Sequence, residues 1–416
     1  MHLKKKLITF LIYGFGQSIN ILSPLLVVPF IIAICGIEGL GKISISFSIS
    51  LILCCIIDYS STIIGTRDIS IHRSNKEYLK NRISDFYLAK LILTIIVTIL
   101  LFLATITIPF LRAEQKLYLY IIPLLIAQLF NPNWILQGLE KFKWIALINI
   151  LSKGCYLLAV FFVINNMTDY IWVNFFLGTS NFIFYFIAIL FINRSLGINY
   201  TVFNLSRAKK LLKTDFRICI SEFCLSIYQF FPIVIVGYFL GNSSAGVFRI
   251  IEQIISVFRT YIFMFFSFSY PTICYDIQEY KEKGKKTWLI YNLANTILIV
   301  LGCLFIYLIK NYVFIFFKVD VSNITTMSSL LVIALFIPII ISISQALRQL
   351  LFALEIIKPY TRIIYITTFL NFILMVLFVK LYGLKGILTS TIIIEAIIIT
   401  SYSYFIQKYN KAILQK

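Results

Sequence analysis

The chain has 416 residues, of which 60% are hydrophobic and only 13% charged, and its mean hydropathy is +0.93. This composition excludes a soluble globular protein, because such a chain could not cover its apolar surface with polar groups. The net charge of +20 does not indicate nucleic-acid binding, because the basic residues lie in short polar segments between apolar stretches.

Apolar stretches of about 20 residues recur along the chain, and each is long enough to cross the hydrocarbon layer as a helix. They predict an all-α polytopic membrane protein of about twelve transmembrane helices. The predicted helices cover residues 7–34, 43–64, 86–110, 118–139, 144–164, 170–192, 216–240, 245–273, 287–310, 325–354, 360–381 and 386–407. The first lacks a small-residue cleavage site, so we interpret it as a retained helix and not a signal peptide.

The distribution of Lys and Arg predicts the orientation of these helices. Of the 37 basic residues, 25 lie in the terminal and connecting segments of one side or in the helix ends next to them. Seven lie in the corresponding positions of the other side, and five lie deeper inside helices. Positive charge is retained on the cytoplasmic side, so both termini are predicted to be cytoplasmic.

Two short motifs recur at about half the chain length. Gly36–Gly41 joins the first two predicted helices and Gly241–Gly246 joins the seventh and eighth. Gly138–Lys143 follows the fourth helix and Ala353–Lys358 follows the tenth. The sequence therefore predicts an internal repeat of two parallel six-helix halves.

The repeat predicts an N-terminal lobe at residues 1–195, a basic cytoplasmic linker at 196–215 and a C-terminal lobe at 216–416. Two such lobes around a central cavity are typical of transporters. Residues 36–42 match the spacing of a phosphate-binding loop, but Ile43 follows where Ser or Thr would hold magnesium. We predict no nucleotide site, and the eight cysteines and two histidines show no metal-binding spacing, so no metal or cofactor is expected.

Polar residues on several predicted helices fall on one face, as expected for helices that line a wet interior. In the eighth helix this face carries Arg249, Glu252, Gln253, Ser256, Arg259 and Thr260. Glu252 lies one turn from Arg249, which predicts an ion pair between them and leaves Arg259 for an anion.

Other helices add narrower polar faces that include Lys153, Glu222 and Arg348. With Arg249 and Arg259 included, the predicted interior holds four cations and only two acids, Glu222 and Glu252. This surplus of positive charge predicts a cationic cavity suited to a diphosphate. The structural alternative is that each cation only pairs with an acid and locks helices together. Lys90 is expected to extend its side chain to the cytoplasmic interface.

Two further motifs carry a resemblance to a known family. The first is Asp58-Tyr59-Ser60 with Gly65-Thr66-Arg67-Asp68-Ile69-Ser70, and the second is Asn131-Pro132-Asn133-Trp134 with Gln137, Gly138 and Glu140. They resemble the ends of helices 2 and 4 in polysaccharide transporters of the multidrug/oligosaccharidyl-lipid/polysaccharide exporter superfamily, and most closely those of Wzx-type O-antigen flippases. Ser60 stands where that family usually has glycine.

The resemblance implies a flippase of the bacterial inner membrane that moves an undecaprenyl-diphosphate-linked O-antigen unit to the periplasmic leaflet. It further implies coupling to H⁺ or Na⁺, for which Glu222 and Glu252 are candidates, and partners such as a polysaccharide polymerase and a chain-length protein. The motif residues Asp58, Arg67, Trp134, Gln137, Gly138 and Glu140 would have family-specific structural roles.

Three alternatives remain open. One is a lipid II flippase, which resembles this fold but typically has more helices. A drug or metabolite exporter of the same superfamily would favour acidic groups in the cavity, and here the surplus is basic. A membrane enzyme of polysaccharide assembly, such as a polymerase or glycosyltransferase, would carry a large periplasmic loop with catalytic residues. The predicted outer connections, such as 165–169 and 241–244, are short, so a catalytic role is not expected.

Overall fold

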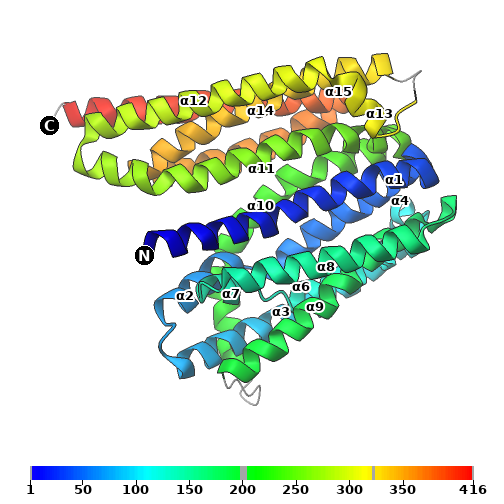
Figure 1. Cartoon of the computed structure of the whole chain (residues 1–416), viewed down its shortest axis with the longest axis horizontal. Helices are drawn as coiled ribbons and strands as arrows, with labels where there is room; N and C mark the ends of the chain where they lie inside the picture. The colour runs from blue at the N-terminus through cyan, green and yellow to red at the C-terminus, as the bar shows by residue number, and fades with distance from the viewer. Residues whose placement is uncertain (1, 197–203, 321–323, 415–416) are drawn as a thin grey trace. The chain divides into compact units, whose positions relative to one another are not determined.

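A computed structural model describes residues 2–196, 204–320 and 324–414 of the chain. The described residues form helices joined by short connections, and the chain divides into two compact units, Met1–Val234 and Ile235–Lys416 (Figure 1). Ten helices of the described part are long and apolar enough to cross a membrane. This confirms the predicted all-helical membrane architecture.

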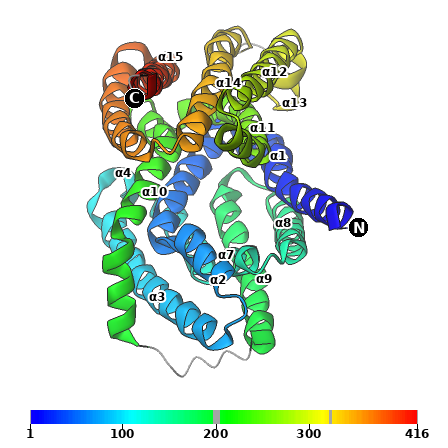
Figure 2. The same cartoon turned by 90° about the vertical axis from the view of Figure 1, so that its left-hand side faces the viewer.

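Unit 1 begins with a long broken helix and contains several short helices between its long ones. Its elements are α1 (His2–Asp58), η1 (Ser61–Gly65), α2 (Thr66–Ile71), α3 (Lys76–Thr107), α4 (Pro109–Arg112), α5 (Gln115–Leu119), α6 (Ile122–Leu129), α7 (Asn133–Gly138), α8 (Phe142–Val163), η2 (Met167–Ile171), α9 (Trp172–Leu196) and most of α10 (Leu205–Leu240). Helix α6 packs on α9. Helix α1 packs on α8, and α2 lies beside α7 (Figure 2).

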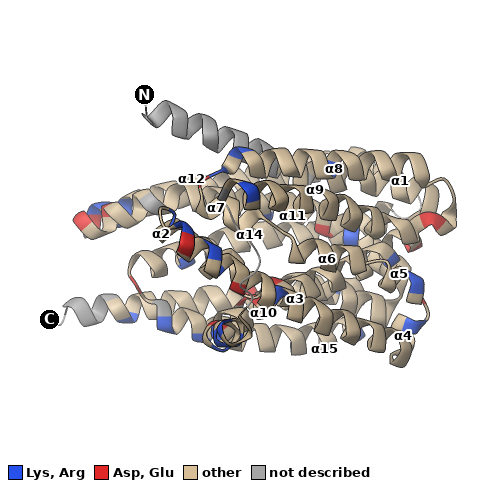
Figure 3. Cartoon of the chain, turned by 90° about the horizontal axis from the view of Figure 1, so that it is seen from below, with Lys and Arg blue, Asp and Glu red and all other residues tan. Residues whose placement is uncertain are grey.

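Unit 2 has fewer and longer elements. They are the end of α10, α11 (Asn242–Glu279), α12 (Lys281–Leu308), α13 (Lys310–Phe316), α14 (Ile324–Ala353) and α15 (Ile357–Leu414). Helix α14 packs on α11, α12 and α15. The charged residues of α12 all lie in its first turns, and the remainder of the helix is uncharged, as expected for a segment that enters a bilayer (Figure 3).

The predicted break between the first two helices is shorter than expected. Gly36 has φ 72° and ψ 176°, and α1 continues helically from the next residue. The expected connector at residues 35–42 is therefore wrong, because one glycine supplies the whole change of direction. Gly383, with φ 59° and ψ −137°, breaks α15 in the same way.

The two repeated motifs share unusual backbone conformations. Gly241 precedes α11 with φ 83° and ψ 172°, close to the values at Gly36. Glu140 and Glu355, at matching positions of the second motif, both have positive φ, 57° and 60°. Left-handed residues other than glycine are uncommon, so the two coincidences support an internal repeat.

The predicted linker at 196–215 is helical from Leu205 onward, and residues 197–203 lie outside the described part of the chain. Helix α10 begins at Leu205, whereas the sequence predicted a helix only from residue 216. Ala208 and Leu211 are buried while Lys209 and Lys210 are exposed. The stretch is thus an amphipathic helix whose basic face looked like a loop in the sequence.

Candidate functional site

A buried polar cluster forms in unit 1 where α1 ends at Asp58. Lys90 Nζ and Gln128 Nε2 each donate to Asp58 Oδ1 at 3.0 Å, from α3 and α6 respectively. Ser61 Oγ donates to the same oxygen at 2.7 Å, and the hydroxyl and backbone N–H of Thr62 donate to the other. The carboxylate therefore ties α1, the π-helical turn η1, α3 and α6 together.

The position of Lys90 overturns the expectation that it reaches the interface. The residue is fully buried, and its ammonium also lies 5.5 Å from the centre of the Trp134 ring. A carboxylate and an aromatic face stabilise the charge locally, so the side chain has no reason to extend toward water.

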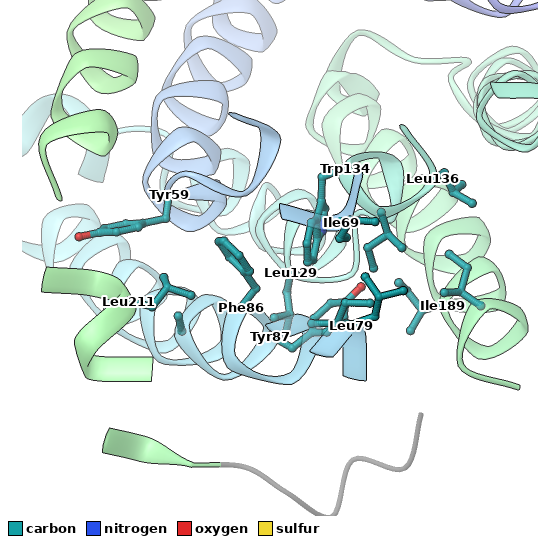
Figure 4. Packing of buried hydrophobic residues seen from close by; sticks show 14 of the residues in the cluster. Tyr59, Ile69, Leu79, Phe86, Tyr87, Leu129, Trp134, Leu136, Ile189 and Leu211 are labelled. Atoms are coloured by element: carbon teal, nitrogen blue, oxygen red, sulfur yellow. The ribbon is translucent and has the colours of Figure 1, made fainter. Parts of the chain in front are cut away.

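The two family motifs pack against each other beside this cluster. Thr66 Oγ1 donates to the Trp134 carbonyl at 3.2 Å, and a Cβ on Gly65 would lie 2.7 Å from the Trp134 ring. A Cβ on Gly138 would lie 2.8 Å from Ile69. Figure 4 shows Trp134 in the cluster of buried residues, near Phe86 and Ile69, and its ring centroid lies 5.0 Å from that of Phe86. Glycine is required at both positions because the helices approach closely.

Four other motif residues lie at or near the surface of the unit. Arg67 and Gln137 are exposed, and the exposed Glu140 pairs with Arg73 at 3.1 Å. Asp68 is bound by Arg82, whose Nε and Nη2 both lie 2.7 Å from one carboxylate oxygen. The Arg73–Glu140 and Arg82–Asp68 pairs fasten the segment between α1 and α3, outside the buried cluster.

A polar pocket of about 340 Å³ opens next to Asp58 within unit 1. Its polar lining combines two carboxylates, two amides and several hydroxyls. These residues are Asp58, Tyr59, Ser60, Thr62, Gln128, Glu222, Ser226 and Gln229. The structure thus brings Glu222, from α10, to the same pocket as the motif residue Asp58. Such a lining can accept hydrogen bonds from a cation, a protonated group or sugar hydroxyls.

The cations of α11 in unit 2 are paired differently from the prediction. Arg259 Nη1 lies 2.7 Å from Glu252 Oε1, so Glu252 pairs with Arg259. The expectation that Arg259 is left open for an anion is therefore wrong. Seven residues are about two helical turns, so the two side chains share a face and the long Arg side chain spans the distance. Arg249 is half-buried on the same helix.

Arg348, on α14, sits among three aromatic rings. Its guanidinium carbon lies 5.7 Å from the ring centre of Phe266, 5.2 Å from that of Phe352 and 5.4 Å from that of Tyr360. Its Nη1 donates to Gln345 at 3.2 Å. Within the described part of the chain, no acid pairs with Arg348, so the rings stabilise its charge without neutralising it.

A hydrogen-bonded network fixes α14 next to Arg348. Gln349 is fully buried and donates to Ser269 Oγ at 2.8 Å, while Asn292 Nδ2 donates to Gln349 Oε1 at 3.0 Å. Trp288 Nε1 donates to the Ala346 carbonyl at 2.9 Å. The network joins α11, α12 and α14, and it holds the backbone that carries Arg348.

Lys153 is half-buried on α8 in unit 1, between the buried Ser152 and the half-buried Gly154. It has no hydrogen bond or ion pair with any described residue. Lys153 and the three arginines belong to different units, and their meeting in one cavity remains a prediction.

Sequence reasoning missed Lys90 and Gln128 as members of the polar cluster. Lys90 was assigned to the interface because it lies near one end of an apolar run. Gln128 is the single amide in the apolar stretch 118–130, and a lone amide there is a signal for a buried hydrogen bond.

These features define a multi-pass helical membrane protein, and its fold is that of solved transporters. The structure of a multidrug resistance MATE family transporter of the MOP superfamily, inward-facing, matches with a TM-score of 0.73 and 16% identity, covering 96% of this chain and 99% of that one. The lipid II flippase MurJ in its inward closed conformation matches with a TM-score of 0.76 and 14% identity, covering 95% and 87%. Identities this low show the fold alone.

The sequence identifies the family. The chain belongs to the family described as "Polysaccharide biosynthesis protein", which matches residues 8–276. A relative from Escherichia coli (strain K12), named "Putative O-antigen transporter", is 25% identical over 233 residues. The match covers 56% of this chain and 56% of that protein, so the chain spans about half the length of this curated relative.

Proposed function

We propose that this protein is a flippase that turns an undecaprenyl-diphosphate-linked oligosaccharide, an O-antigen repeat unit, from the cytoplasmic to the periplasmic leaflet of the bacterial inner membrane. The sugar head cannot cross hydrocarbon unaided, because its hydroxyls would lose their hydrogen bonds to water. Family membership and the fold support a transporter of this kind.

The observation that carries the proposal is the environment of Arg348. Rings approach its guanidinium, and Gln345 occupies one donor. A guanidinium presents five donors in one plane, so further donors remain for a ligand. A phosphate accepts two such parallel bonds, which makes a diphosphate a suitable ligand for an arginine held in this way.

Arg249, Arg259 and Lys153 are proposed as further contacts for the diphosphate. Arg259 can bind an anion only if it leaves Glu252, and that carboxylate would then stay behind without its partner. An unpaired carboxylate in apolar surroundings favours a proton or a cation. Glu252 is thus one candidate for ion coupling, and Glu222, beside Asp58 in the unit 1 pocket, is the other.

We further propose twelve membrane spans with both termini in the cytoplasm. The candidate spans Ser18–Asp58 and Lys358–Tyr409 contain 41 and 52 residues. At 1.5 Å per residue they extend about 60 and 78 Å, enough for two crossings each of a hydrocarbon core of about 30 Å. The ten long helices then give twelve spans, in lobes at residues 1–195 and 216–416 that rock to open the site to each side.

Complementation of a strain that lacks its O-antigen flippase tests the function. The wild-type chain should restore surface O-antigen, Arg348→Ala should abolish it, and Arg348→Lys should restore it only weakly, because lysine lacks the planar fork. Arg112→Ala, at an exposed arginine of α4, is the matched control and should behave as wild type.

Protein levels in the membrane must be equal among the variants. Normal O-antigen display by Arg348→Ala would remove this residue from the substrate site. Export of cationic drugs by a wild-type chain that fails to restore O-antigen would instead support a drug exporter.

A further inference from the structure

A groove of about 660 Å³ lies within unit 2, between the start of α12 and the ends of α14 and α15. Its walls combine charged residues with large apolar ones. The lining residues are Glu282, Lys285, Lys286, Trp288, Leu289, Leu347, Leu350, Leu354, Ser403, Ile406 and Gln407. None of the cations proposed for the diphosphate belongs to it.

Polar and apolar residues separate along the groove. Lys285 and Lys286 are in the second turn of α12, while Leu289 begins the uncharged remainder of that helix. Leu350 and Leu354, buried at the end of α14, form part of the apolar wall. Since α12 enters the bilayer at this point, the groove crosses the boundary between headgroups and hydrocarbon.

Trp288 lies at this boundary and is held in place. Its indole N–H donates to the Ala346 carbonyl, which leaves the ring surface to face the groove. Tryptophan prefers the membrane interface because one part of it is polar and the rest apolar.

The charge at the rim is suited to an anion. Lys286 is exposed and pairs with no acid among the described residues. Lys285 Nζ forms an ion pair with Glu282 Oε1 at 3.0 Å. Glu282 is itself 85% exposed, so water screens it strongly and the rim keeps a positive character.

We propose that this groove binds an anionic phospholipid of the surrounding bilayer. Lys285 and Lys286 would contact the phosphate, and an acyl chain would lie along Leu289, Leu347 and Leu350. Basic pockets between transmembrane helices are suited to anionic lipid headgroups, where each lysine adds to the attraction. A single phosphate suits two lysines, which act as point charges, whereas a diphosphate favours the bidentate fork of arginine.

Native mass spectrometry of the full chain in detergent tests the proposal. Phosphatidylglycerol and phosphatidylcholine with identical oleoyl chains are titrated onto the delipidated protein. We expect one phosphatidylglycerol to bind about tenfold more tightly than phosphatidylcholine, and K285Q/K286Q to remove that preference while leaving phosphatidylcholine binding unchanged.

The matched control is K209Q/K210Q, which changes two adjacent exposed lysines of α10 and should retain the preference. Equal binding of the two lipids by the wild type would overturn the proposal, and so would an unchanged preference in K285Q/K286Q. Displacement of phosphatidylglycerol by an equal concentration of undecaprenyl diphosphate would assign the groove to the carrier lipid instead.

Discussion

Replacement of Lys90 by methionine should destabilise unit 1 strongly. Methionine keeps much of the apolar stem and removes the ammonium that lies 3.0 Å from Asp58 Oδ1. The side chain of Lys90 is 1% exposed and that of Asp58 is 16% exposed, so water cannot replace the lost charge. Breaking a buried ion pair from one side costs about 3–5 kcal/mol. Gln128, Ser61 and Thr62 still donate to the carboxylate, so we expect the lower end, about 3 kcal/mol.

The double variant D58N/K90M separates the contribution of the ion pair to the free energy of unfolding from the contribution of side-chain packing. D58N leaves a buried ammonium and should cost about as much as K90M, whereas the double variant leaves no charge and should recover at least about 2 kcal/mol. Unfolding in detergent, followed by tryptophan fluorescence, measures the three values. K76M, at an exposed lysine in the first turn of α3, is the control. Equal stability of K90M and K76M would refute the reasoning, as would a double variant no more stable than K90M.

Three further changes have defined outcomes. Gly65→Ala would place a methyl group 2.7 Å from the Trp134 ring and should lower the stability by about 1–3 kcal/mol in the same unfolding assay, unless the ring can move aside. Gln349→Leu leaves Asn292 and Ser269 without this buried partner and should cost about 2 kcal/mol, whereas a neutral result would mean that water satisfies them. Glu252→Gln removes the acid that pairs with Arg259; flipping in proteoliposomes should then no longer respond to an imposed H⁺ or Na⁺ gradient. A normal response would transfer the coupling role to Glu222.

The presence of long membrane-spanning helices and the sites of two helix breaks could be predicted because they depend on local signals. Apolar length marks the spans, and the glycines at 36 and 241 mark the breaks with almost the same backbone angles. The extent of each break could not be predicted, because the residues after Gly36 are compatible with either a loop or a continued helix. The helix in the basic segment at 205–215 could not be predicted, because its buried apolar residues, Ala208 and Leu211, are too few to indicate a helix face.

Which acid each buried cation pairs with was harder to predict than which helix face the cation occupies. Helical periodicity placed Arg249, Glu252 and Arg259 on one face, but it could not decide which arginine takes the acid. Lys90 and Asp58 come from different helices, 32 residues apart, and their meeting depends on tertiary packing. A sequence pattern fixes which face a charge occupies, whereas the neighbouring helix fixes what it meets.

The buried cations therefore differ in what they can offer a substrate. An acid holds Lys90 and another holds Arg259, and each such pair has no net charge until it is broken. Aromatic rings surround Arg348, and the ring quadrupole stabilises a cation without cancelling its charge. Under the proposed function, Arg348 would attract a diphosphate before contact is made, whereas Arg259 would first have to give up Glu252. This order would link anion binding at Arg348 to release of a carboxylate at Glu252, which is the exchange that the proposed ion-coupled flippase requires.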